Sequence, residues 1–538
     1  MNKETFSSGL MNTMFIISIC GIVCAITFSS FSQKLSGNRT SDLKPLLSGK
    51  LSESEFAVIY KTSSNLEFVL EKYNTGISEL WKTKFTVDDK VKESRIDLYR
   101  IISYGNRLAL FLGYVVKDQK PAYLFYAYMF DLNKGDLIEK PKLFSAEFDI
   151  DKTPADIFKR ANFTTSPNGK KILLSVKKDY PDWFPGIEKK NIKVETYAMV
   201  WDENLDEIFN QTLVIDDNPY KGKEISCDVE VSNNGTVYAI RKEPPHKITV
   251  DCYTAGNPGF FSLTDSLPDV SQNLLKSNDF LFREYGVAVT NDNSVIISLG
   301  TKKTGNYNLN SYFIYKFNFI KKEAEHFTRF DLTAEFLNNV INPALVSQSK
   351  KPVKELETTE VKDVLLTDDS ILIVIAEQSD RQRGHYYSAP VMGMSSGGGM
   401  TMYGGGGMTQ DKYKSGNILL MAFDLDGKPR WQNIIAKKQY ISFRQAISHF
   451  SKIIGNELLL ISYCNAPEKD GYQTYIFRIN MDTGKLTATK KLYMKDKREE
   501  GIYNDLIEWF KDRDLLLIRK MENSLFNEPP TILSLFEF

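Results

Sequence analysis

Short polar turns followed at once by runs of β-branched and aliphatic residues recur along this chain of 538 residues. Such runs suit strands of about five to eight residues that are buried in a sheet. Eight turns of this kind are present, centred near residues 53, 105, 168, 234, 292, 368, 455 and 513. Their spacing is about 60 residues once the two longest steps, which contain insertions, are set aside. The pattern predicts one structural unit that is repeated along the chain.

The second half of each repeat is also predicted to be β-structure. A further apolar strand ends in a turn rich in Asn, Asp and Gly and leads into one more strand. These turn residues tolerate the positive φ of tight hairpins, so the two strands are expected to be antiparallel neighbours. The clearest copies are residues 66–85, 122–144, 195–215, 416–436 and 474–493. Each repeat is therefore predicted to be a four-stranded antiparallel meander.

Repeated meanders with almost no helical periodicity predict an all-β fold, a single β-propeller that occupies residues 33–538. Two unrelated β-sandwiches would not space their strands so evenly. We expect eight blades, with seven as the alternative. The last repeat, Asn504–Phe538, shows only three strands, and residues 42–48 are needed as the first strand of the first repeat. The two termini are therefore expected to complete one blade together and close the ring.

Two segments resemble the repeats of the quinoprotein-like (PQQ-type, WD-like) β-propellers. They are FDLDGKPRWQ at 423–432 and YNTGISELWKTKF at 73–85, and they place Trp431 and Trp81 where that family has a docking tryptophan. Enzymes of the family carry adjacent cysteines, a calcium site and a catalytic Asp, whereas no two cysteines are adjacent here. The resemblance therefore implies the non-enzymatic envelope propellers of bacteria, which present loops to partner proteins.

Residues 1–32 are predicted to be a signal peptide. The apolar run Met14–Phe28 is shorter than the roughly 20 residues of a membrane-spanning helix, and small residues follow it at Ser30 and Ser32. We expect cleavage after Ser32 and export, so that the protein is periplasmic, extracellular or associated with the outer membrane. A retained membrane anchor is the alternative, in which case only this segment contacts the membrane.

The charge balance and the motifs narrow the class of function. The chain has 68 acidic and 68 basic residues, so no net field attracts nucleic acid. Its four histidines are scattered over different repeats without metal-ligand spacing and are expected to be loop or rim residues. No nucleophile elbow, zinc-binding helix motif or phosphate-binding glycine loop occurs in the sequence. We therefore predict no catalytic residue, no metal and no cofactor.

The lengths of the connections indicate the working surface. In a propeller, the loops between second and third strands share one face with the connections between blades, and here both sets are long. The turns on the opposite face are mostly two to four residues long. Because binding residues concentrate on long loops over a rigid scaffold, the insertion-bearing face is expected to bind a partner.

Two of these long loops supply the candidate partner-binding residues. Trp183 and Phe184 lie between two prolines, which suits contact with a protein or stacking on a sugar; folding back over the blade rim is the alternative. Residues 379–415 form a Met- and Gly-rich insertion that is expected to be flexible and to adapt to a partner, with copper(I) binding or a functionless insertion as alternatives. Its candidates are His385, Tyr386, Tyr387, Met392, Met394, Met400, Met402 and Tyr403.

Together these observations favour an exported, non-catalytic, monomeric β-propeller that binds an envelope protein or glycan through its insertion-bearing face. The alternative is an exported hydrolase that acts on a glycan or peptide in the central channel. Two or three carboxylates converging in a polar pocket would favour the hydrolase, because paired carboxylates carry glycoside hydrolysis. An exposed aromatic patch around Trp183 would favour the binding protein.

Overall fold

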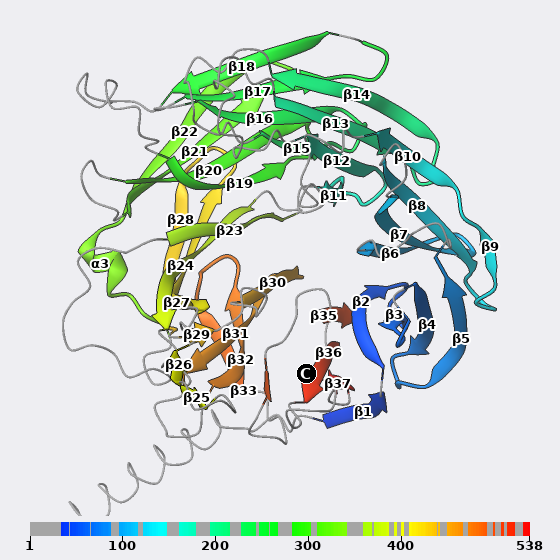
Figure 1. Cartoon of the computed structure of the whole chain (residues 1–538). Coiled ribbons are helices and arrows are strands. Elements are labelled where there is room, and N and C mark those ends of the chain that lie inside the picture. The colour runs from blue at the N-terminus through cyan, green and yellow to red at the C-terminus, as the bar shows by residue number, and fades with distance from the viewer. Residues whose placement is uncertain are drawn as a thin grey trace, which may run out of the picture.

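The described chain is almost entirely β-structure, in sheets that follow one another round a ring in chain order (Figure 1). The structure is a computed structural model. It describes residues 34–41, 43–64, 66–87, 96–116, 122–147, 161–178, 194–215, 227–243, 247–257, 259–266, 282–302, 309–341, 359–367, 371–386, 392–394, 400–402, 408–437, 439–441, 449–465, 472–491, 499–500, 507–510, 514–521 and 531–537. Within these segments, no helix is both long enough and apolar enough to cross a membrane.

The first four blades are antiparallel sheets, each built from one continuous stretch of chain. Blade 1 contains β2 (Lys44–Lys50), β3 (Glu55–Lys61), β4 (Glu67–Asn74) and β5 (Glu79–Thr86). Blade 2 contains β6 (Ile96–Tyr104), β7 (Arg107–Val116), β8 (Ala122–Asp131) and β10 (Lys142–Glu147), with β9 (Leu137–Glu139) beside β8. Blade 3 contains β11 (Ala161–Thr165), β12 (Ile172–Lys178), β13 (Val194–Trp201) and β14 (Glu207–Ile215). Blade 4 contains β15 (Cys227–Val231), β16 (Val237–Glu243), β17 (Lys247–Tyr253) and β18 (Phe260–Ser266).

Three further blades complete the continuous part of the ring. Blade 5 contains β19 (Phe282–Val289), β20 (Ser294–Lys302), β21 (Leu309–Asn318) and β22 (Glu323–Asp331). Blade 6 contains β23 (Thr359–Leu366), β24 (Ile371–Tyr386), β27 (Met408–Asp424) and β28 (Pro429–Ile435), with β29 (Gln439–Ile441) beside β27. Blade 7 contains β30 (His449–Ile454), β31 (Glu457–Asn465), β32 (Tyr472–Asn480) and β33 (Leu486–Lys491). Each blade is thus the predicted four-stranded meander.

The two ends of the chain meet in one further sheet, which we call the closing sheet. It contains β1 (Lys34–Ser41), β34 (Glu499–Glu500), β35 (Ile507–Phe510), β36 (Asp514–Met521) and β37 (Thr531–Glu537). β1 pairs antiparallel with β37, from Lys34 opposite Glu537 to Ser41 opposite Thr531. Figure 1 shows this contact between the two ends of the colour scale. The prediction that the termini close the ring is confirmed, because the last repeat borrows a strand from the N-terminal part.

The blade count needs correction. The chain forms seven self-contained blades, which is the number given above as the alternative. The eighth repeat expected from the turn pattern does not make a four-stranded blade of its own, because β1 from the N-terminal part supplies the strand that pairs with β37. By contrast, the strand that the first repeat needed is present, since β2 covers residues 44–50 and pairs with β3.

Apolar cores lie between neighbouring blades. Between blades 3 and 4, for example, Leu173 and Val200 belong to the same buried cluster as Val229 and Ala239. Each sheet is therefore buried on both faces, which explains why its inner strands are nearly continuous apolar runs. The closing sheet joins this arrangement through Leu533, which is fully buried in a cluster with residues of blade 1.

The face that carries the first-to-second and third-to-fourth turns, here called the short-turn face, is joined by hydrogen bonds between blades. The backbone N–H of Asn168 donates to Oδ1 of Asn233 at 2.9 Å, and Nδ2 of Asn233 donates to Oδ1 of Asn291 at 2.9 Å. These residues belong to the equivalent turns of blades 3, 4 and 5. The asparagines that the sequence used as turn signals therefore also connect neighbouring blades.

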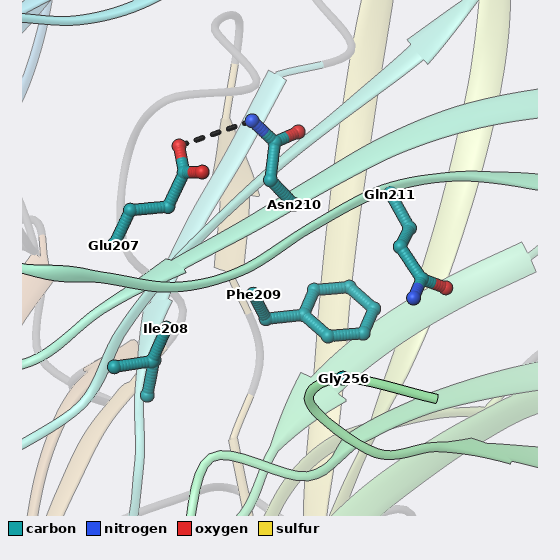
Figure 2. Close-up of a pocket in the computed structure, with 6 residues that line it drawn as sticks. All are labelled: Glu207, Ile208, Phe209, Asn210, Gln211 and Gly256. Atoms are coloured by element: carbon teal, nitrogen blue, oxygen red, sulfur yellow. Dashed lines mark hydrogen bonds between the residues drawn. The ribbon is translucent and has the colours of Figure 1, made fainter. Parts of the chain in front are cut away.

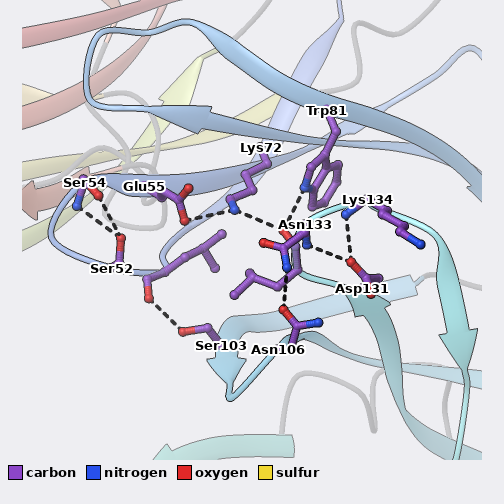
Figure 3. A network of polar contacts seen from close by, with 12 residues as sticks. Ser52, Ser54, Glu55, Lys72, Trp81, Ser103, Asn106, Asp131, Asn133 and Lys134 are labelled. Carbon is purple, nitrogen blue, oxygen red and sulfur yellow. Dashed lines mark hydrogen bonds and ion pairs between the residues drawn. The ribbon is translucent and has the colours of Figure 1, made fainter.

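Two tryptophans add contacts between blades on this face. Trp81 on β5 donates its indole Nε1 to the backbone carbonyl of Leu132 in blade 2 at 2.9 Å. The buried Lys72 donates to the same carbonyl at 3.0 Å, as Figure 3 shows. Trp431 on β28 donates in the same way to the carbonyl of Met481, which follows β32 of blade 7, at 2.5 Å. Both residues therefore dock onto the next blade, as the resemblance implied.

A short helix, α3 (Ala334–Leu337), lies between blades 5 and 6. The side chain of Thr333 caps its N-terminus by accepting the backbone N–H of Phe336 at 3.1 Å. Phe336 and Leu337 are buried in the core that blades 5 and 6 share. The interblade connection is thus tied to the ring at this point rather than running freely over the surface.

Candidate functional site

The most elaborate described connection is the one between β24 and β27, the second and third strands of blade 6. Both strands are longer than any other, with 16 and 17 residues. Their antiparallel pairing runs past the blade, from Ser379 opposite Ser415 to Tyr386 opposite Met408. We call these two paired extensions, residues 379–386 and 408–415, the ribbon. The predicted insertion of residues 379–415 therefore begins and ends as paired β-structure.

A two-stranded sheet of methionines lies within the same insertion. β25 (Met392–Met394) pairs antiparallel with β26 (Met400–Met402), with Met392 opposite Met402 and Met394 opposite Met400. In an antiparallel pair, residues directly opposite each other share a face, and so do residues two apart on one strand. The register therefore places all four methionine positions on one face. The sequence did not reveal this, because it does not fix the register of the two strands.

The ribbon leaves the blade at residues 378 and 416–417, which we call the root of the ribbon and which hydrogen bonds hold in place. A register shift between Glu377 and Ser379 marks the point. Oε1 of Gln378 accepts the backbone N–H of Asn417 at 3.1 Å, and Oδ1 of Asn417 accepts the backbone N–H of Lys437 at 3.2 Å. A side chain at Gly416 would lie only 2.8 Å from Gln378 Oε1, so glycine permits this close approach. The chain after Lys437 then forms β29, which pairs with the ribbon strand β27 at residues 413–415.

A buried cluster of charges lies under this root. Nζ of Lys437 is 2.5 Å from Oε1 of Glu377, and the exposed fractions of the two side chains are 0% and 1%. Nδ1 of His449 is 3.3 Å from the other carboxylate oxygen of Glu377, and its Nε2 is 3.3 Å from Oδ2 of Asp363. The hydroxyl of Ser451 donates to the same Asp363 oxygen at 2.5 Å. The cluster joins blade 6 to β30, the first strand of blade 7.

The protonation states make this cluster electrically balanced. Burial alone would raise the pKa of Glu377, but the charge of Lys437 and the hydrogen bond of His449 outweigh it and hold that pKa well below its usual value. Burial would lower the pKa of His449, but its hydrogen bonds to Asp363 and Glu377 outweigh burial and raise it. Burial would also raise the pKa of Asp363, and its hydrogen bond from His449 reverses that shift. At a pH below the raised pKa of His449, two carboxylates therefore face two cations.

Several predicted site residues cannot be placed. Trp183, Phe184, Tyr387 and Tyr403 lie outside the described residues, and so do the second-to-third connections of blades 2, 3, 4, 5 and 7. His385 and Tyr386 lie at the far end of β24, opposite Thr409 and Met408. The structure thus brings His385 and Tyr386 onto the ribbon and the four methionines onto β25 and β26.

One expectation about histidines is wrong. His449 is not a rim or loop residue, because it begins β30 and is 6% exposed. No spacing rule could have found its partners, since Glu377 and Asp363 lie 72 and 86 residues before it and belong to another blade. One signal was available in the sequence: Glu377 is the charged residue that ends the apolar run from Ile371 to Ala376.

A pair of carboxylates bears on the hydrolase alternative. Asp228 and Glu230 lie two residues apart on β15, the first strand of blade 4, and Asp228 accepts a hydrogen bond from the hydroxyl of Tyr285 in blade 5. Burial, followed by the charge of Asp228, raises the pKa of Glu230 to about 7. A carboxyl group with such a pKa can act as a general acid near neutral pH. Across the described segments, no cluster of three or more His, Cys, Asp or Glu is placed to hold a metal ion.

No family model and no curated protein sequence matched this chain. Among solved structures, it is similar to the WD40 domain of SCAP from fission yeast, at 9% identity and a TM-score of 0.38, over 94% of this chain and 98% of that one. It is similar to a prolyl endopeptidase at 9% identity and a TM-score of 0.38, over 90% of this chain and 55% of that one. A polysaccharide lyase matches at 10% identity and a TM-score of 0.35, over 94% and 99% of the two chains.

These three likenesses are remote, so the sheets and their closure define the class of protein: the chain is a β-propeller of four-stranded antiparallel blades. A propeller is a scaffold that supports both binding and catalysis, and the fold alone selects neither.

Proposed function

We propose that this protein is an exported, non-catalytic β-propeller that binds a partner protein of the cell envelope through its insertion-bearing face. Export rests on the apolar N-terminal run Met14–Phe28, and the envelope on the resemblance of two repeats to non-enzymatic bacterial propellers. The ribbon and the β25–β26 sheet form the binding element. A protein partner is favoured over a glycan because a face of methionines adapts to apolar protein surface, whereas glycans require hydrogen bonds and aromatic stacking.

The root of the ribbon is the observation that carries this proposal. An insertion without a function needs no fixed attachment, yet this one leaves the blade over a buried cluster of four charged groups, and the side chains of Gln378 and Asn417 accept backbone hydrogen bonds there. Fixing the root lowers the entropy that the insertion loses when a partner binds, which raises affinity without adding contacts.

The test compares two four-site variants in pull-downs from envelope extract. In one variant Met392, Met394, Met400 and Met402 become Ser, and in the matched control they become Leu. If the methionines supply apolar contact, Leu retains the partner and Ser loses it. Recovery of the same proteins by both variants contradicts the proposal. Loss with both variants points instead to a specific role of the thioethers, such as copper(I) binding.

The hydrolase is kept as a second candidate because of Glu230 alone. If the protein cleaves a glycan or peptide in its channel, Glu230→Gln abolishes that cleavage, since an amide cannot donate a proton as a carboxylic acid does. The assay measures release of reducing ends and of free amines from envelope material. No release by the wild-type protein across pH 5 to 8 removes this candidate.

A further inference from the structure

A pocket lies on the outer edge of blade 3, where this blade meets blade 4. It has a volume of about 370 Å³ and is lined by Glu207, Ile208, Phe209, Asn210, Gln211 and Gly256. Five of these residues belong to β14, the outermost strand of blade 3, and Gly256 lies in the turn after β17. This volume falls in the range of small-molecule pockets, about 300–1,000 Å³. It is near the short-turn face, remote in sequence from the ribbon.

Phe209 occupies the position of the docking tryptophans. In blade 1 the register shifts between the pair Tyr73–Glu79 and the next pair, which contains Trp81. In blade 6 it shifts between Phe423 opposite Pro429 and Ala422 opposite Trp431. In blade 3 the same shift separates Trp201 opposite Glu207 from Val200 opposite Phe209. Phe209 is therefore the structural equivalent of Trp81 and Trp431.

At Trp81 and Trp431, the indole ring fills the space over the turn glycine of the next blade. A Cβ atom added at Gly135 would lie 2.6 Å from the ring of Trp81, and one added at Gly484 would lie 2.5 Å from the ring of Trp431. Both glycines have positive φ, at 79° and 66°. Each indole thus lies directly on the turn glycine of the next blade.

At Phe209, the equivalent space over the turn glycine of the next blade is not filled. Gly256 has a positive φ of 74°, like the other two glycines, but a Cβ atom added there would meet nothing within 4 Å. Phe209 itself is buried at 3% exposure. At this turn the hydrogen bond to the next blade comes from Gln211, whose Nε2 donates to the carbonyl of Asn257 at 3.1 Å. Figure 2 shows Phe209 above Gly256, with Gln211 to one side and the hydrogen-bonded Glu207 and Asn210 to the other.

We propose that this pocket binds the indole side chain of a tryptophan presented by a peptide segment of another protein. The same backbone arrangement holds an indole of this chain at two other blade contacts. Phe209 would contact the ring, and Gly256 leaves the space beneath it. The carboxylate of Glu207 accepts one hydrogen bond from Asn210, at 3.0 Å, and has a second oxygen to accept the indole N–H.

The test uses the full-length protein and two short peptides, Ac-Gly-Trp-Gly-NH2 and the matched Ac-Gly-Leu-Gly-NH2, observed by ligand NMR. Saturable binding of the Trp peptide, at least about tenfold tighter than that of the Leu peptide, supports the proposal. Phe209→Trp is expected to fill the pocket from within and abolish binding. Glu207→Ala, a change at an exposed position, is expected to weaken binding about threefold to tenfold without affecting folding.

Two outcomes overturn the proposal. One is the absence of selective binding of the Trp peptide by the wild-type protein at millimolar concentration. The other is binding that both Phe209→Trp and Glu207→Ala leave unchanged, which would place the peptide elsewhere. Neither outcome affects the ribbon, because the pocket and the ribbon lie on different blades.

Discussion

Lys437 and Glu377 form an ion pair of 2.5 Å from which solvent is almost completely excluded. A charge in such a place is costly unless it is paired and hydrogen-bonded. Here the pair is extended by His449, so that both oxygens of Glu377 have cationic partners. Lys437 also leads into β29, and Glu377 lies on β24 two residues before the ribbon begins. The pair therefore joins the strand that begins the ribbon to the segment leading into β29, which pairs with the other ribbon strand.

Removing one partner of this pair should destabilise the fold strongly. Lys437→Met leaves Glu377 buried without its main cation, and such changes cost about 3–5 kcal/mol. The double variant Lys437→Met with Glu377→Leu should recover most of that loss, because no buried charge remains. The free energy of unfolding in urea measures both. Equal destabilisation by the single and double variants would show that packing, and not charge, is lost.

Stability should depend on pH through His449. Its pKa is raised above the unfolded value of 6.5, so its contribution is fully present below about pH 6.5 and is lost as the pH rises through the folded pKa. The pKa values of Glu377 and Asp363 are lowered in the folded protein. Their contributions to stability are therefore fully present above the unfolded pKa values of 4.5 and 3.8, and are lost as the pH falls through the folded pKa values. The cluster is therefore most stabilising between about pH 4.5 and 6.5.

Unfolding free energies measured from pH 5 to pH 9 test this expectation. The wild-type protein should lose stability towards high pH, because the charged His449 loses its proton as the pH rises through its raised pKa. His449→Gln should be less stable at pH 5.5 and should show a flatter profile. A wild-type profile that rises from pH 6 to pH 9 would contradict the assignment of a charged His449.

Two glycines of blade 7 form a matched pair for testing the tryptophan docking. Gly455 and Gly484 have positive φ, at 55° and 66°, but a Cβ atom added at Gly455 meets nothing within 4 Å. Gly455→Ala should cost about 1–2 kcal/mol, from backbone strain alone. Gly484→Ala should cost about 1–3 kcal/mol more, because it also pushes against Trp431. Thermal unfolding compares the two, and equal costs would mean that Trp431 does not constrain this turn.

The closing sheet can be tested by truncation. Removing residues 1–41 deletes β1 and leaves one edge of β37 unpaired, so the melting temperature should fall by several degrees or more. Removing only residues 1–32 keeps β1 and should leave the melting temperature unchanged. If both truncations melt alike, β1 does not contribute to closure.

The sequence was sufficient for the features that repeat. Turn signals such as Asn168 and Asn233 fixed the position of each hairpin, and Trp81 and Trp431 indicated contacts with the next blade. Closure was also predictable, because the last repeat had one strand too few. These features depend on local chemistry or on counting strands, both of which a single sequence provides.

Features that join different repeats were not predictable. The partners of His449 come from β23 and β24, and the lysine that pairs with the same Glu377 follows β28. No spacing within one repeat relates these residues. The alignment of Met392 with Met402 depends on a strand register that glycine-rich sequence leaves unspecified. The pocket beside Phe209 became visible only when the register showed that this residue replaces a tryptophan.

The most direct test of the proposed function is the affinity of the captured partner for a variant without the ribbon. In this variant, residues 379–415 are replaced by Asn-Gly, which joins Gln378 to Gly416 through a tight turn. The wild-type protein and the variant are compared by isothermal titration calorimetry, after circular dichroism has shown that both are folded. Binding to the variant is expected to fall at least about a hundredfold or to be lost. An unchanged affinity would place the binding surface elsewhere and contradict the proposed function of the insertion.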